Sequence, residues 1–153
     1  MTSQHPTETT QARAIDLLLA QYAESHRHPT NEWIHIVCVP TIVFTLLGLL
    51  WSVHPAVALA ASIAALLYYC SLSLPFAAGM LLMAGSMLAL LWQLPQAQIL
   101  KLCASVFVLA WIGQFIGHKI EGKKPSFFDD LRFLLIGPLF VLGFLYRRLQ
   151  LRW

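Results

Sequence analysis

Residues 34–100 read IHIVCVPTIVFTLLGLLWSVHPAVALAASIAALLYYCSLSLPFAAGMLLMAGSMLALLWQLPQAQIL and contain no Asp, Glu, Lys or Arg. Over all 153 residues, 58% are apolar and 11% are charged, whereas ordinary globular chains are about 25% charged. A small soluble domain exposes much of its surface and has no room to hide such a stretch from water. The stretch therefore predicts an integral-membrane protein. The net charge of +3 reflects basic residues near span ends, so we expect no nucleic-acid partner.

The apolar sequence is divided into segments near the length of a membrane-spanning helix, which is about 20 residues. Each break contains a proline, at Pro55, Pro75 and Pro95, and proline suits the first turn of a helix. The sequence predicts an all-α, polytopic membrane bundle in a single domain, with four spans at residues 36–53, 55–74, 75–92 and 99–117. A fifth apolar segment, 133–146, is short for a crossing, so we expect an interfacial or re-entrant helix there.

The basic residues indicate the orientation, because Lys and Arg concentrate on the cytoplasmic side of a membrane. With four crossings, every basic residue except Lys101 lies on one side, together with both termini. Residues 10–25 carry Ile15, Leu18, Leu19 and Tyr22 at helical spacing. This pattern predicts an amphipathic helix on the cytoplasmic membrane surface, preceded by a disordered tail at residues 1–9 that contains His5.

Two polar stretches flank the spans, and the topology predicts that they meet. The first is SHRHPTNEWIH, residues 25–35, and the second is WIGQFIGHKIE, residues 111–121. In the second, Gln114, His118 and Glu121 share one helix face. An even number of crossings returns the chain to the same membrane surface, whereas an odd number leaves the two stretches about 30 Å apart. We therefore expect His26, His35, His118 and Glu121 to come together at the cytoplasmic surface.

Imidazole and carboxylate ligands suit Zn, Fe(II), Mn or Cu, so the cluster is a candidate single-metal site. Alternatively, the histidines hydrogen-bond loose carbonyls at helix ends, and the chain is a non-catalytic lipid-binding or transport bundle. A zinc-dependent lipid hydrolase is a further alternative. Interfacial polar residues count against transport, because transporters place such groups near the bilayer midplane. His54 falls on the opposite surface and is expected to be structural, while His28 is a ligand, a donor behind the ligands or a turn residue.

The two polar stretches also carry a family pattern. Tyr22, His26, Asn31, His35 and Pro40 form Y-x-x-x-H-x-x-x-x-N-x-x-x-H-x-x-x-x-P, and residues 114–125 form Q-F-I-G-H-x-x-E-x-x-x-P. Together these motifs resemble the small integral-membrane family of Fe(II)-dependent 2-hydroxy-fatty-acid dioxygenases. The eukaryotic branch of that family works in the α-oxidation of phytosphingosine-derived fatty acids. The resemblance covers about residues 15–148.

The resemblance implies an Fe(II) cofactor and cleavage between C1 and C2 of a 2-hydroxy fatty acid by O₂, giving a fatty acid one carbon shorter. It implies His26, His35 and His118 as iron ligands, with Glu121 either completing the ligand set or acting just outside it. The residues expected to orient ligands or contact substrate are Tyr22, Arg27, His28, Asn31, Gln114, Lys119 and Lys123.

Two positions depart from the family pattern: His28 stands where many members have Asn, and Ser126 follows Pro125 in place of the usual alanine. The expected partners are the substrate, O₂ and membrane lipids. The sequence gives neither the oligomeric state nor the acyl chain length.

Overall fold

The computed structural model describes residues 13–122 and 133–151, so the predicted tail, Lys123 and Ser126 lie outside the described residues. Within those ranges the chain is helical and has no strand. The helices are α1 (Ala14–Ala23), α2 (Pro29–Val53), α3 (Pro55–Leu72), α4 (Leu74–Gln93), α5 (Gln96–Glu121) and α7 (Ile136–Arg148). Four of them, α2 to α5, are long and apolar enough to cross a membrane. The predicted all-α bundle with four spans is therefore confirmed.

Two His-Pro pairs start the first two spanning helices. His28 has extended backbone angles, its Nδ1 accepts a hydrogen bond from the Thr30 N–H at 3.2 Å, and Pro29 begins α2. His54 repeats this arrangement before α3, where its Nδ1 accepts from the Ala56 N–H at 3.2 Å. The imidazole satisfies an N–H that has no partner inside the helix, and proline has the φ angle that the first turn requires. Both side chains thus act as helix caps.

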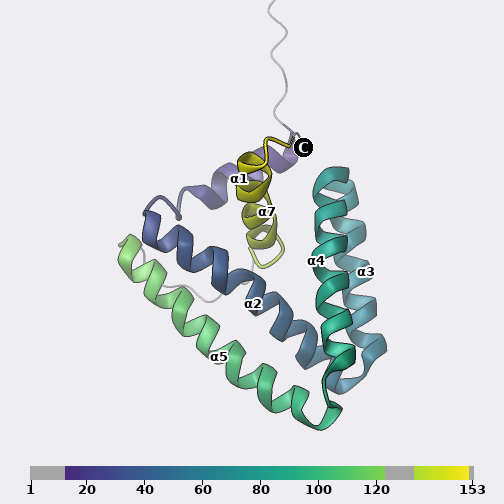
Figure 1. Cartoon of the computed structure of the whole chain (residues 1–153). Coiled ribbons are helices and arrows are strands. Elements are labelled where there is room, and N and C mark those ends of the chain that lie inside the picture. Colours follow the sequence, from purple (N-terminus) through teal and green to yellow (C-terminus); the bar gives the residue numbers. More distant parts are fainter. Residues whose placement is uncertain (1–12, 123–132, 152–153) are drawn as a thin grey trace, which may run out of the picture.

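Helices α2 and α5 lie side by side and antiparallel along most of their length (Figure 1). Three glycines allow this close approach, because each faces a larger side chain on the other helix. The facing pairs are Gly48 with Cys103, Gly113 with Cys38, and Gly117 with Asn31. A Cβ atom at any of the three would collide with its partner. Small residues have this role in membrane helices generally, where backbones must approach closely to gain dispersion contacts.

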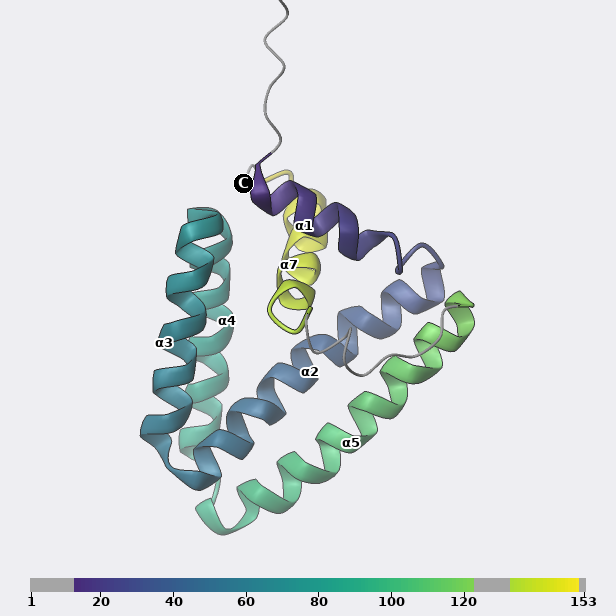
Figure 2. The ribbon, with the colours of Figure 1, turned by 180° about the vertical axis from the view of Figure 1, so that it is seen from behind.

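Helices α3 and α4 form a second antiparallel pair, and α7 lies between that pair and α1 (Figures 1 and 2). Two tyrosines fix α7 by donating to backbone carbonyls: the Tyr69 hydroxyl donates to Leu135 at 2.9 Å, and the Tyr146 hydroxyl donates to Pro75 at 2.7 Å. The 13 residues of α7 rise about 20 Å. This is less than the roughly 30 Å hydrocarbon core, and it fits the short interfacial or re-entrant helix expected here.

The glycine contacts predict that one added methyl group destabilises the α2–α5 pair. Gly48→Ala should lower the free energy of unfolding in detergent by about 1–3 kcal/mol, because its Cβ overlaps Cys103. The control is Gly85→Ala in α4, where an added Cβ meets no atom within 4 Å and alanine favours the helix. Combining Gly48→Ala with Cys103→Ala should restore part of the loss. Equal stabilities for the Gly48→Ala and Gly85→Ala proteins would contradict the packing described.

Candidate metal centre

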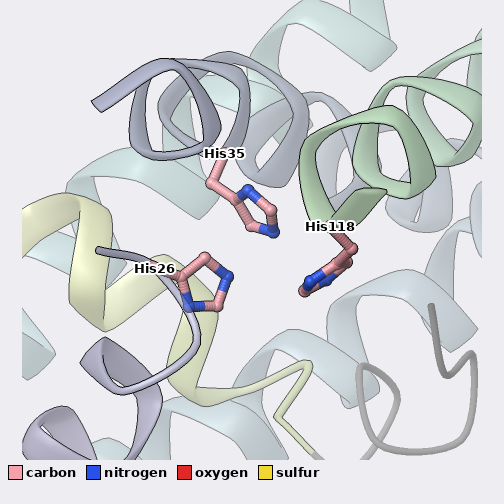
Figure 3. Close-up of side chains that lie close together, drawn as sticks. All are labelled: His26, His35 and His118. Atoms are coloured by element: carbon pink, nitrogen blue, oxygen red, sulfur yellow. The ribbon is translucent and has the colours of Figure 1, made fainter. Parts of the chain in front are cut away.

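Three buried histidines from distant parts of the chain form one cluster. His26 lies in the linker between α1 and α2, His35 lies in the second turn of α2, and His118 lies near the end of α5. One potential ligand nitrogen from each ring lies within 4.8 Å of the other two. The ring centroids are 4.1 Å apart for His26 and His35, 5.0 Å for His35 and His118, and 5.5 Å for His26 and His118. Figure 3 shows the three rings facing one another.

Backbone carbonyls fix the protonation of two of these rings. Nδ1 of His26 lies 2.7 Å from the Tyr22 carbonyl oxygen, and Nδ1 of His35 lies 2.9 Å from that of Asn31. A carbonyl oxygen only accepts, so Nδ1 must carry the proton and donate it. The lone pair of each neutral ring is then on Nε2, which is the nitrogen left for a metal ion. Metal-binding histidines are commonly oriented by this kind of hydrogen bond.

Aromatic rings hold the His26 side chain from the outside of the cluster. Tyr22 stacks on His26 with a centroid distance of 4.1 Å and an interplanar angle of 6°. Phe140 of α7 lies 5.7 Å from His26 and 5.1 Å from Tyr22. The sequence placed Tyr22 near the site but not Phe140. Phe140 belongs to the fifth apolar segment, and the sequence does not show which face of that segment packs against the site, because this depends on tertiary contacts.

Glu121 supports the cluster from the end of α5 and does not belong to the group of potential metal ligands. Its carboxylate accepts from the backbone N–H groups of Arg27 at 2.9 Å and His28 at 2.8 Å, and from the Asn31 side-chain amide at 3.0 Å. The same Asn31 amide donates to the Ser25 carbonyl at 3.2 Å. Of the two roles expected for Glu121, this geometry favours the one outside the ligand set. The carboxylate ties the linker that carries His26 to the helix that carries His118.

The carboxylate of Glu121 occupies an unfavourable position on its own helix, and its hydrogen bonds compensate for that. Gly122, with φ of 75°, ends α5 in the left-handed conformation, so Glu121 lies in the last turn. A negative charge is unfavourable at a helix C-terminus and favourable near an N-terminus. Here the Glu121 side chain reaches the first turn of α2 and accepts three hydrogen bonds. These contacts offset the unfavourable position on its own helix.

Of the other residues that the sequence analysis expected to orient ligands or contact substrate, one lies at the cluster and several lie away from it. Gln114 is 5% exposed and lines a cavity of about 30 Å³ together with His35 and Tyr22. Its Oε1 has no hydrogen-bond partner among the described residues. His28 is exposed and caps α2, so it lies outside the group of potential ligands. Arg27 and Lys119 are also exposed, and His54 caps α3 as expected.

The donor set fits a divalent transition metal. Imidazole nitrogen suits zinc, iron, copper and nickel, and a centre held by three protein ligands keeps open positions for small molecules. Metal–nitrogen bonds of about 2.0–2.1 Å place neighbouring ligand atoms near 3 Å apart. The three candidate nitrogens lie within 4.8 Å of one another, so the ring positions are near those of a three-histidine metal site.

Comparison with known proteins identifies the family of this arrangement. A family model described as 2-hydroxy-palmitic acid dioxygenase Mpo1-like matches residues 13–149. The chain belongs to the Mpo1-like family. It is 33% identical over 134 residues to the 2-hydroxy-palmitic acid dioxygenase MPO1 of Saccharomyces cerevisiae, in an alignment that covers 81% of this chain and 75% of the yeast protein. No solved structure matches the chain. The resemblance inferred from the two Mpo1-like motifs is thereby confirmed.

The Glu121 contacts predict a local change when the carboxylate is removed. In Glu121→Ala, the amide hydrogens of Arg27 and His28 lose their acceptor, and hydrogen bonds to a charged group contribute about 1.5–3 kcal/mol each. Hydrogen–deuterium exchange of these two amides should therefore accelerate by roughly tenfold or more, since 1.4 kcal/mol is a factor of ten.

The matched control is Glu24→Gln, which changes an exposed acid in the same linker and should leave both exchange rates as in the unmodified protein. Unchanged exchange in Glu121→Ala would show that Glu121 does not hold the linker.

Proposed function

We propose that the chain is an Fe(II)-dependent dioxygenase that cleaves the C1–C2 bond of a 2-hydroxy fatty acid and yields a fatty acid one carbon shorter. The observation that carries the proposal is the cluster of three buried histidines, His26, His35 and His118, in a chain that the family model matches over residues 13–149. The yeast relative is named for 2-hydroxy-palmitic acid, which supports a long-chain 2-hydroxy acid as substrate.

The three histidines would hold the iron ion, His26 and His35 through Nε2, and the ion when bound would supply the activation of O₂. The chain itself orients the imidazoles and packs aromatic side chains against His26. Carbonyls of Tyr22 and Asn31 fix two of the imidazoles, while Tyr22 and Phe140 pack against the His26 ring. Glu121 positions the linker. These contacts leave the inner side of the cluster as the place where a substrate headgroup approaches.

Gln114 is suited to contact that headgroup. Gln114 lines the small cavity that His35 also lines, and its buried Oε1 has no hydrogen-bond partner in the part of the chain that the structure describes. A buried polar atom without a partner is costly unless something binds to it. The 2-hydroxyl group of the substrate is a donor of the right kind. Arg27, Lys119 and Lys123 are proposed to attract the substrate carboxylate toward the cytoplasmic membrane surface, where we place the site and both termini.

A zinc-dependent lipid hydrolase is the second candidate, and the donor set is the reason. Three histidines without a carboxylate also form the ligand set of catalytic zinc, whereas many non-haem iron oxygenases use two histidines and a carboxylate. The zinc alternative is supported by the composition of the group of potential ligands, which holds three histidines and does not include Glu121. The family match favours the dioxygenase. Identifying the bound metal and measuring oxygen consumption distinguishes the dioxygenase from the hydrolase.

The first test of the proposal removes single histidines. Protein purified in detergent and reconstituted anaerobically with Fe(II) should consume O₂ with 2-hydroxypalmitic acid and release the acid one carbon shorter. His35→Ala and His118→Ala should lose bound iron, measured by elemental analysis, together with product formation. His54→Ala is the matched control and should keep both, because it removes only a helix cap worth about 1 kcal/mol.

Two results would overturn the dioxygenase proposal. One is retention of metal and activity in His35→Ala and His118→Ala. The other is tightly bound zinc with hydrolysis of a lipid ester and no oxygen consumption.

A second test concerns Gln114. Gln114→Leu should keep its iron content, while kcat/KM for 2-hydroxypalmitic acid falls by about 10- to 100-fold, since a lost buried hydrogen bond costs roughly 1–3 kcal/mol. Gln98→Leu on the exposed face of α5 is the control and should leave both values unchanged. Loss of iron in Gln114→Leu would instead assign Gln114 to the support of the metal ligands.

A further inference from the structure

An apolar groove with a volume of about 350 Å³ lies between α2, α3 and α4 and is bounded at one end by the start of α7. This volume is within the range of roughly 300–1,000 Å³ that is typical of small-molecule sites. The side-chain hydroxyls that line the groove belong to Ser62 and Tyr69, and both are already engaged. Ser62 donates to the Ala58 carbonyl at 2.8 Å, and Tyr69 donates to the Leu135 carbonyl at 2.9 Å. The groove therefore suits a hydrocarbon.

The groove lies next to the small cavity beside the histidine cluster. Leu134 lines both spaces. Along α2, Val39 and Ile42 follow His35 on the wall of the small cavity, and residues 43–50 follow on the wall of the groove. From residue 35 to residue 50, the helix rises about 22 Å. The two spaces together match a molecule with a polar head at His35 and a long apolar tail.

We propose that this groove holds the acyl tail of the substrate and limits its length, an inference that rests on the proposed function. Exposed Leu59, Ile63 and Leu81 form part of the wall, so the groove opens toward the bilayer and a fatty acid enters sideways. Bilayer lipid is about as apolar as the leucine wall. Transfer from the bilayer to the groove therefore gains little free energy per methylene group. The length of acyl chain that binds is then determined by the space in the groove.

Two small residues in the half of the groove farther from His35 set that space. Gly85 of α4 lines the groove, and a Cβ built there meets no atom within 4 Å. Ala61 lies on the α3 wall. A bulky side chain at either position would add volume to the groove wall, and at Gly85 its Cβ enters open space. Long tails should then be excluded while short tails still fit.

The first experiment compares 2-hydroxypalmitic with 2-hydroxyoctanoic acid as substrates of the iron-loaded protein. In Gly85→Phe and Ala61→Phe, the ratio of kcat/KM for the long to the short acid should fall by about tenfold, with kcat/KM for the short acid unchanged. Ala89→Phe and Ala64→Phe add the same bulk to exposed positions of the same two helices outside the groove and should leave the ratio as it is. Ratios that stay within twofold in both groove variants would overturn the proposal.

A second experiment reads occupancy without turnover. A 2-hydroxy fatty acid with a diazirine near its terminal methyl group is photolysed with the intact protein in phospholipid vesicles, and the adducts are located by mass spectrometry. Labelling at residues 59–66 and 81–88 that excess 2-hydroxypalmitic acid suppresses is the expected result. Labelling elsewhere, or labelling that the competitor leaves unchanged because bilayer lipid fills the groove, overturns the proposal. Labelled, competed protein that forms no product from any chain length would instead refute the dioxygenase reaction alone.

Discussion

The arrangement of the site depends on one carboxylate that joins two segments of the chain far apart in sequence. Glu121 ends α5 and binds backbone amides of residues that lie 93 and 94 positions earlier in the sequence. Those amides belong to the linker that carries His26 and leads into α2. Without this contact, α2 and α5 would still pair through their glycines, but the linker that carries His26 would lose its hydrogen bonds to α5 and would be held mainly by its contacts with α1, Asn31 and Phe140. The three hydrogen bonds to the Glu121 carboxylate therefore hold the linker, and with it His26, in place beside His35 and His118.

Much of this site follows from features that are local in the sequence. Uncharged segments of spanning length fixed the number of crossings, and their even number placed His35 and His118 at one membrane surface. The proline at the His54-Pro55 break predicted the start of α3, whereas α2 begins at Pro29, ahead of the predicted span at 36–53. For His28 the sequence left open a ligand, a donor behind the ligands and a turn residue, because all three roles use the same imidazole.

Other features depend on contacts that no local pattern encodes. The 3.6-residue period shows that His118 and Glu121 share a face, but not that Glu121 turns to the linker amides. The docking of α7 against His26 through Phe140 depends on hydroxyls of Tyr69 and Tyr146 that find carbonyls 66 and 71 residues away. An acidic residue in the last turn of a helix was an available signal, since a charge opposed to the helix dipole implies a compensating partner.

The distance along the chain between His26 and His118 has a consequence for biosynthesis. Contacts between residues so far apart in sequence form only after the intervening chain has been ordered. A ribosome that has completed α4 has released His26 and His35, yet the third imidazole and the carboxylate clamp are still unsynthesised. Assembly of the cluster therefore cannot precede the synthesis of α5. A nascent chain has no complete set of three imidazoles until His118 has been added.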